Sequence, residues 1–354
     1  MATKPPVEVP QGAIRLNTDS QKLEFFAQDQ WWEMATEETI TTSQRGISAG
    51  GAIPGATPAS PSPGSVTRIE YLNMASGGNA AYFGDLTVSR YCRVGGAGSS
   101  TRGIFGGGYN YPTLNQYLNT IDYITIDTQG DAIDFGDVTT KTMHAAVLSN
   151  STRWVSAGGH LTNGPAYPVS NHMCYVTIPS TGNAIDFGDM TDARWAHGSG
   201  ANRTRGIYAG GSIQYIPNQG DTNNIQFITI ATTGNTTDFG DLAQACHWTQ
   251  GASNNVRSVF VGGYVSPTHR DLTQMVNITS TGNGVDFGDL ASAGLNAGVC
   301  AAPTAGIMMG GEPGRLTHLQ KFSLNGSDAR TFMFGDLTTG IAYNAGTSNC
   351  HGGL

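Results

Sequence analysis

One triplet, Phe-Gly-Asp, occurs six times along this chain at intervals close to fifty residues. The copies begin at Phe83, Phe135, Phe187, Phe239, Phe287 and Phe334, so successive steps are 52, 52, 52, 48 and 47 residues. A second motif keeps the same period, a short apolar run that ends in two glycines, as in Arg205–Gly211. Two motifs that share one period indicate a supersecondary unit that has been copied along the chain. Residues common to every unit are therefore expected to be scaffold, and function is expected in what differs between units.

Each unit reads as four short strands. In the second unit, Tyr123–Ile126 alternates β-forming residues, a turn follows at 128–131, and the chain is extended again up to Phe135. Later units place Gly beside Asn in this turn, which supplies the positive φ that a tight hairpin needs. A stretch of small residues and then the glycine-pair strand complete the unit. Four strands per period of about fifty, with no helical pattern, predict an all-β fold, a six-bladed kelch-like β-propeller.

The two ends of the chain predict how the ring closes. In each internal unit, the glycine-pair strand opens 16 or 17 residues after the Asp of the triplet, but after Asp336 this count reaches Gly352, two residues before the last. The strand that this unit lacks occurs near the other end, at Arg45–Gly51. We therefore predict that this strand pairs with the small-residue strand at roughly 342–349. One blade would then combine N- and C-terminal strands and leave no exposed sheet edge.

Residues 1–40 lie outside the repeat, which occupies 41–354. Three short strands are predicted there, at 12–16, 22–26 and 30–34, so the propeller is preceded by a short β segment. This segment concentrates apolar surface that has to be covered. Packing against the propeller rim is one interpretation, and docking on another protein is the other. We predict an anchoring role for Phe25, Phe26, Trp31 and Trp32.

Composition excludes several classes of function. The chain has 18 Lys and Arg against 26 Asp and Glu, a net charge of −8, and no basic cluster, which argues against nucleic-acid binding. It has no apolar run near eighteen residues and no signal peptide, so no membrane insertion is expected. The five cysteines occupy different offsets within their units, which argues against a disulfide framework and favours a reducing compartment.

Two segments resemble proteins of tailed phages. Residues 12–25, followed by 30–33, resemble the opening segment of many tailed-phage fibre and virion structural proteins. Residues 228–242 resemble repeats in virion proteins of marine and cyanobacterial phages, and Ala305 and Met333 depart from the repeat pattern. The resemblance implies a virion component made in the bacterial host cytoplasm, often near the tail or on an appendage, without an established chemistry. Other virion proteins are the expected partners of the N-terminal segment.

Motifs that suggest catalysis or metal binding have simpler explanations. Asp134-Phe135-Gly136 matches the metal-binding triplet of kinases, but this triplet occurs four times in the chain, without the other kinase motifs. The Asp after the Gly, as in Asp137 and Asp189, is expected to cap a turn or to bond backbone N–H groups between blades. We expect no catalytic residues and no cofactor.

Three histidines are candidates for a metal site. His144, His197 and His247 lie seven, eight and six residues after the Asp of the triplet, where a ring of pore-facing imidazoles would bind a metal. A slip of one residue turns a side chain to the other face of a strand, so at least one of the three should point away. We therefore expect no metal centre.

The segments after the glycine pairs differ most between units. They span 52–67, 109–120, 160–171, 212–224, 264–272 and 312–319. Equivalent loops of a propeller emerge on one face, and tyrosine offers large contact area and stacks on sugar rings. The alternative is that these are ordinary solvated loops with incidental tyrosines. The expected binding face consists of Tyr109, Tyr111, Tyr117, Tyr167, Tyr215 and Tyr264.

These observations favour a non-enzymatic virion structural protein, a tail or fibre-type appendage component. Its propeller would bind host-surface glycans or other virion proteins. A capsid decoration protein is the first alternative. A carbohydrate-active propeller enzyme is less favoured, because the variable loops offer few carboxylates, namely Asp221, Asp271 and Glu312.

Overall fold

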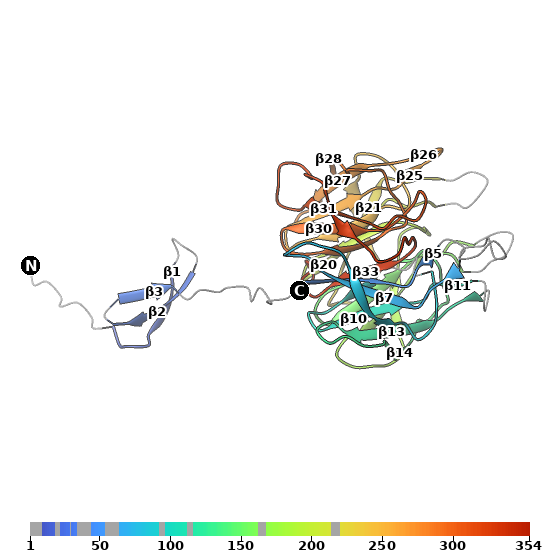
Figure 1. Cartoon of the computed structure of the whole chain (residues 1–354). Helices are drawn as coiled ribbons and strands as arrows, with labels where there is room; N and C mark the ends of the chain where they lie inside the picture. The colour runs from blue at the N-terminus through green and yellow to red at the C-terminus, as the bar shows by residue number, and fades with distance from the viewer. Residues whose placement is uncertain are drawn as a thin grey trace, which may run out of the picture. The chain divides into compact units, whose positions relative to one another are not determined.

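The computed structural model describes residues 9–17, 22–28, 30–33, 44–53, 64–91, 96–111, 116–161, 168–213 and 220–354. These residues form strands, bridges and turns without a helix, and hence without a helix long and apolar enough to cross a membrane (Figure 1). The chain divides into two compact units, Met1–Thr42 and Ser43–Leu354, which are described separately.

The first unit is a three-stranded antiparallel meander of β1 (Ile14–Asn17), β2 (Lys22–Ala27) and β3 (Gln30–Glu33). The ring of Phe26 packs edge-on against Trp31 at 5.3 Å, and the Arg15 guanidinium lies 4.0 Å over the same indole. Trp32 is 43% exposed, whereas the side chain of Phe25 lies outside the described residues. Phe26 and Trp31 therefore cover each other, and Trp32 presents apolar surface to solvent.

The second unit consists of six four-stranded antiparallel sheets, here called blades 1 to 6. In each sheet the small-residue strand is innermost, and the strand that carries Phe-Gly-Asp is outermost. The inner strands contact one another in a closed cycle, β33, β9, β15, β19, β23, β29 and back to β33. This arrangement is a six-bladed β-propeller, which confirms the predicted fold.

From the inner to the outer strand, blade 1 has β33 (Ala345–Ser348), β4 (Arg45–Ala49), β7 (Arg68–Asn73) and β8 (Ala81–Asp85), and blade 2 has β9 (Gly96–Gly98), β10 (Arg102–Gly106), β13 (Thr120–Thr125) and β14 (Ile133–Asp137). Blade 3 has β15 (Ala146–Ser149), β16 (Arg153–Ala157), β17 (His172–Thr177) and β18 (Ile185–Asp189), and blade 4 has β19 (Gly198–Ala201), β20 (Arg205–Ala209), β21 (Asn224–Thr229) and β22 (Thr237–Asp241). Blade 5 has β23 (Gln250–Ser253), β24 (Arg257–Val261), β27 (Leu272–Asn277) and β28 (Val285–Asp289), and blade 6 has β29 (Gly298–Ala301), β30 (Ala305–Met309), β31 (His318–Ser323) and β32 (Phe332–Asp336). Two-residue strands form small ribbons in the variable loops: β5 (Ala52–Ile53) with β6 (Gly64–Ser65), β11 (Tyr109–Asn110) with β12 (Gln116–Tyr117), and β25 (Tyr264–Val265) with β26 (Thr268–His269).

Blade 1 is assembled from both ends of the chain, as the repeat count predicts. Strand β33 pairs antiparallel with β4, with Ala345 opposite Ala49 and Ser348 opposite Gly46. The side-chain oxygen of Asn349 also accepts a hydrogen bond from the Arg45 backbone N–H at 3.0 Å. The ladder leaves β4 without a free edge, because β4 lies between β33 and β7.

The repeated triplet forms one half of a joint between blades. At the joint between blades 2 and 3, Gly182 donates its N–H to the Phe135 carbonyl at 2.8 Å, and Asp137 donates its N–H to Asn183 Oδ1 at 3.0 Å. Gly136 has φ 145°, and a Cβ there would lie 2.5 Å from the Gly182 carbonyl oxygen. The Gly-Asn turn is therefore the other half of the joint. The backbone N–H of Asp137, rather than the expected carboxylate, makes the bond between blades.

A cation that opens the second strand adds a second connection at most joints. Arg102 donates to the Ile178 carbonyl of the next blade at 2.8 Å, and corresponding bonds start from Arg45, Arg153, Arg205 and Arg257. Blade 6 has Ala305 at this position. There Lys321, from the neighbouring strand β31, donates to the Met74 carbonyl of blade 1 at 2.9 Å and lies 4.6 Å over the Phe334 ring. The departure at Ala305 is thus compensated from another strand.

Strand direction gives the propeller two different faces. All inner strands begin at the upper face, which also holds the loops between second and third strands and the connections between blades. The chain enters the propeller at Gln44 on the lower face, where Asn349–Leu354 also lies after β33. Figure 1 shows β5, β11, β25 and β26 on one side of the propeller and the C-terminus on the other. The variable loops therefore share the face opposite to the point where the chain enters.

Candidate functional site at the upper mouth of the central channel

A cavity of about 100 Å³ lies on the propeller axis, lined by residues from the inner strands of all six blades. The inner strands carry small residues here because they approach each other closely: a Cβ added to Gly346 would clash with the Val299 carbonyl oxygen of the adjacent inner strand. None of the described residues that line the cavity is Asp, Glu, Lys or Arg. The polar lining is formally neutral and includes His144, Ser149, His197, Ser199, Gln250, Ser253, Asn296, Asn344, Thr347 and His351.

His197 is a buried polar group of this lining. It is 4% exposed, and neither ring nitrogen has a hydrogen-bond partner in the protein. Desolvation, with a smaller contribution from Arg194, holds the pKa of His197 well below its ordinary value, so the ring is neutral. Asn296 Nδ2 and Thr347 Oγ1 also lack protein partners. An unsatisfied buried polar group costs about 1–3 kcal/mol, so these atoms favour a polar, hydroxyl-bearing ligand.

The upper mouth is ringed by residues in a left-handed backbone conformation. The seventh residue after the triplet Asp has positive φ in every blade connection described at this position: His144 (65°), Ala196 (54°), Trp248 (57°), Asn296 (56°) and Tyr343 (61°). Asn and, to a lesser degree, His are enriched in this region among these residue types, whereas Ala, Trp and Tyr cost roughly 1–2 kcal/mol each there. All five line the cavity. The blade connection therefore imposes the conformation and points these side chains at the mouth.

A cluster of tyrosines flanks the mouth above blades 1 and 2. The ring of Tyr91 lies 5.8 Å from Tyr343 and 6.0 Å from Tyr109, and Tyr109 stacks on Tyr111 at 6.2 Å. Tyr109, Tyr111 and Tyr343 are half-buried, so each keeps part of its ring accessible. Tyr117, expected on the binding face, is instead 6% exposed, because its ring packs edge-on against Tyr109 at 5.4 Å.

A second aromatic cluster lies above blades 4 and 5. The half-buried indole of Trp248 lies 5.7 Å from the Tyr264 ring and 5.7 Å from that of Trp195. Tyr264 in turn contacts His269 at 5.5 Å. The His247 Nδ1 lies 2.7 Å from a carboxylate oxygen of Asp221.

The structure distributes the expected site residues unevenly. Tyr109, Tyr111 and Tyr264 lie on the upper face within the two aromatic clusters, whereas Tyr167 and Tyr215 lie outside the described residues. Sequence reasoning missed Tyr91, Trp248 and Tyr343, because it looked for contact residues only in the variable loops. The available signal was their spacing from the triplet Asp, which is six residues for Tyr91 and seven for Trp248 and Tyr343.

The three histidines considered as a metal site do not act together. His144 and His197 line the cavity, and His247, at a different offset, is not among the lining residues. Among the described residues, no group of three or more His, Cys, Asp or Glu side chains is arranged to hold a metal ion. The four described cysteines, Cys174, Cys246, Cys300 and Cys350, are free thiols.

The segment Asn349–Leu354 crosses the lower mouth of the channel. His351 Nε2 donates to the Gly98 carbonyl of blade 2 at 2.8 Å, and its Nδ1 accepts the Gly353 N–H at 3.1 Å. Gly352 donates to the Ser253 carbonyl of blade 5 at 2.9 Å, so the segment spans the axis between blades on opposite sides of the ring. The polar interior of the channel is therefore approached from the upper mouth.

Comparisons with known proteins bear on the fold alone. No family model matches the sequence, and no curated protein matches it. A solved structure described as "Structure of YjhT" superposes with a TM-score of 0.62 at 8% identity, covering 75% of this chain and 91% of that one. Likeness at so low an identity supports the β-propeller architecture and transfers no activity.

Proposed function

We propose that this chain is a phage virion structural protein, a tail or fibre-type appendage component that presents the upper face of its propeller to host-surface glycans. The observation that carries the proposal is the neutral channel mouth with its aromatic rim, on the face opposite to Gln44, where the chain enters the propeller. The resemblance of residues 12–25 and 228–242 to segments of phage virion proteins supports the virion setting.

The chemistry of the mouth suits a neutral sugar. Aromatic faces stack on sugar rings, and Trp248 and Tyr343 supply half-buried rings at the mouth. Below them, His197 and Asn296 offer polar atoms that have no partner in the protein. A concave site with an apolar rim and a few convergent polar groups is the usual form of a small-ligand pocket. The terminal residue of a glycan chain therefore fits this site better than a charged ligand does.

Binding is favoured over hydrolysis. Most glycosidases need a pair of carboxyl groups, one on each side of the scissile bond. The described residues of the channel lining supply neither Asp nor Glu, and Asp221 lies beside His247, outside this lining. A lectin-like role follows from this chemistry, and a carbohydrate-active enzyme remains the weaker candidate.

The N-terminal meander is proposed to attach the chain to other virion proteins. It exposes Trp32 at 43% and Ile14 at 64%, which is much apolar surface for so small a sheet. Removing residues 1–36 should leave a folded propeller that no longer incorporates into particles. Normal copy number of the truncated chain in purified particles would contradict this role.

The glycan-binding role is tested with two substitutions at the mouth. Trp248→Asn and Tyr343→Asn remove a ring and keep a residue type that the left-handed conformation tolerates, as Asn296 shows. Each should weaken binding to purified host envelope polysaccharide about tenfold or more, equivalent to about 1.4 kcal/mol, with little change in the thermal midpoint. Tyr82→Asn, a 49% exposed tyrosine on the outer strand β8, is the matched control.

The same proteins distinguish the capsid decoration alternative. Purified capsid and tail proteins are tested for binding to the wild type and to both mouth variants. Binding to a capsid protein that both variants lose, with no polysaccharide binding by the wild type, would support decoration and overturn the glycan proposal. Polysaccharide binding that both variants retain would place the working surface elsewhere.

A further inference from the structure

A second cavity, of about 230 Å³, lies at the joint between blades 6 and 1. Residues of β4 and β7, together with the connection that follows β32, line it. The cavity is separate from the central channel, and the proposed glycan site does not use it. Its principal lining residues are Ser48, Val66, Arg68, Glu70, Thr339 and Ile341.

The joint between blades 1 and 2 shows what occupies the corresponding space. Arg90, five residues after the triplet Asp85, is fully buried there. Its Nη2 bonds Asp122 at 2.5 Å, and its Nη1 donates to the Thr120 carbonyl at 2.9 Å and the Gly107 carbonyl at 3.2 Å. This joint therefore holds a guanidinium between a carboxylate and backbone carbonyl groups.

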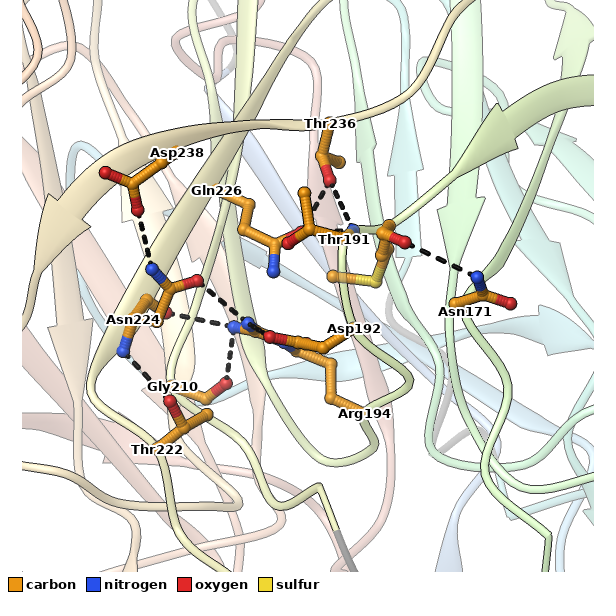
Figure 2. A network of polar contacts seen from close by, with 11 residues as sticks. Asn171, Thr191, Asp192, Arg194, Gly210, Thr222, Asn224, Gln226, Thr236 and Asp238 are labelled. Atoms are coloured by element: carbon orange, nitrogen blue, oxygen red, sulfur yellow. Dashed lines mark hydrogen bonds and ion pairs between the residues drawn. The ribbon is translucent and has the colours of Figure 1, made fainter.

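A guanidinium at the joint between blades 3 and 4 uses the same carbonyl groups. Arg194 Nη1 donates to the Gly210 carbonyl at 3.1 Å and to the Asn224 carbonyl at 2.9 Å (Figure 2). Its remaining N–H groups bond Asp192 from its own connection and the side chain of Asn224, as Figure 2 shows. Two independent joints thus place an arginine head group against equivalent backbone.

The joint between blades 6 and 1 has a carboxylate and backbone carbonyl groups at the same positions, but it lacks the arginine. Glu70 is the third residue of β7, as Asp122 is of β13, and both follow a β-bulge in the same register. Arg68 stands in the place of Thr120, so its carbonyl corresponds to one that Arg90 bonds. Ile341, five residues after the triplet Asp336, replaces the arginine. This joint therefore combines a buried carboxylate with an apolar side chain where the guanidinium would be.

The other joints lack this combination. The positions that correspond to Arg90 and Asp122 hold Thr142 with Cys174, Cys246 with Gln274, and Gly294 with Gln320. Among the described joints, the 6–1 joint alone has a carboxylate at the position of Asp122 and no arginine at the position of Arg90.

Glu70 retains capacity to accept further hydrogen bonds. Its side chain is 7% exposed and pairs at 2.7 Å with Arg68 Nε, whose own side chain is 38% exposed and so reaches toward solvent. The Thr338 hydroxyl and backbone N–H also bond Glu70. An ionised carboxylate has about four acceptor sites, so an incoming donor can share it.

We propose that the cavity at the 6–1 joint binds a guanidinium group supplied by a ligand. The group would take the position that Arg90 holds at the 1–2 joint. It would bond Glu70 and the carbonyl groups of Arg68 and Thr339, which correspond to Asp122 and to the carbonyl groups of Thr120 and Val88 that Arg90 bonds. Charge-assisted bonds of guanidinium to carboxylate are among the stronger hydrogen bonds in proteins. The lining side chains Val66 and Ile341 suit the apolar stem that carries such a group.

Calorimetric titration with agmatine, a guanidinium on a short alkyl stem, tests the assignment directly. The wild type should bind one agmatine per chain, and Glu70→Gln should weaken binding at least tenfold. Asp271→Asn, which removes an exposed loop carboxylate, is the matched control and should bind as the wild type does. Equal affinity of the wild type and Glu70→Gln, or no binding by the wild type, would overturn the proposal.

A second variant fills the site from within. Ile341→Arg should place a guanidinium where Arg90 has its own, raise the thermal midpoint by a few degrees and abolish agmatine binding. Agmatine binding by a folded Ile341→Arg protein as tight as that of the wild type would refute the assignment. Trp248→Asn should leave agmatine binding unchanged, so this result stands apart from the glycan experiment.

The source of the group is distinguished with a blocked Gly-Arg-Gly peptide. Binding of the peptide as well as agmatine would show that the cavity admits an arginine from another protein. Binding of agmatine alone would restrict it to small guanidinium compounds.

Discussion

His351 should make the closure of the lower channel mouth sensitive to acid. Its Nε2–H donates to Gly98 and its Nδ1 accepts from Gly353, so the bonds require the neutral ring. Burial lowers the pKa of His351 from 6.5 to about 4, although the Gly98 bond opposes the shift. His351 therefore binds a proton below about pH 6.5 in the unfolded chain, but only below about pH 4 in the folded chain. Stability is present above pH 6.5 and is lost as the pH falls toward 4, by up to about 3 kcal/mol.

Urea unfolding at several pH values between 7.5 and 4.5 measures this loss. The titration of His351 alone should lower the free energy of unfolding of the wild type by about 2–3 kcal/mol over that range, at constant dependence on urea. His351→Gln keeps a donor for Gly98 and cannot titrate, so its pH dependence should be shallower by about one proton. His197 contributes in the same direction, and His197→Asn separates its share. Identical pH dependence of wild type and His351→Gln would refute the reasoning.

Three further predictions concern the ring itself. Deleting residues 338–354 should abolish cooperative unfolding, because it removes β33 and leaves β4 as an open edge; a calorimetric transition as sharp and as hot as that of the intact chain would contradict closure. Gly136→Ala should cost at least about 2 kcal/mol in urea unfolding, because its Cβ would meet the Gly182 carbonyl oxygen at 2.5 Å, whereas Gly64→Ala, with open space around it, should cost little. Lys321→Met should cost about 1–2 kcal/mol by removing the bond to Met74, and an unchanged midpoint would show that Ala305 needs no substitute.

The fold could be predicted from the sequence because the repeated residues are those that the joints between blades require. Gly136 has to be glycine where two backbones meet, and its copies recur wherever a blade adjoins the next. The closing strand at Arg45 was predictable for the same reason. The compensation of Ala305 by Lys321 was not, because the two residues lie on different strands and only the folded sheet brings them to one place.

The site was less accessible. The connections that carry Trp248 and Tyr343 resemble spacers of small residues. The side chains of Trp248 and Tyr343 point at the mouth because their backbone is left-handed, and neither residue type predicts this conformation. Tyr117 looked like its exposed neighbours, and its burial depends on the ribbon that pairs β11 with β12. The cavity beside Glu70 can be interpreted only in the folded structure, where Ile341 at one joint is compared with Arg90 at another.

The position of β4 in blade 1 has a mechanical consequence. This strand begins directly after Gln44 at the lower face. It lies between β33 and β7 and is hydrogen-bonded along both edges. Hydrogen bonds of antiparallel strands run perpendicular to the strands. A pull on the upper face, resisted at the N-terminal side, therefore loads both ladders in shear, all bonds together, rather than peeling them one at a time. Tension on the propeller is carried by the strand that closes it.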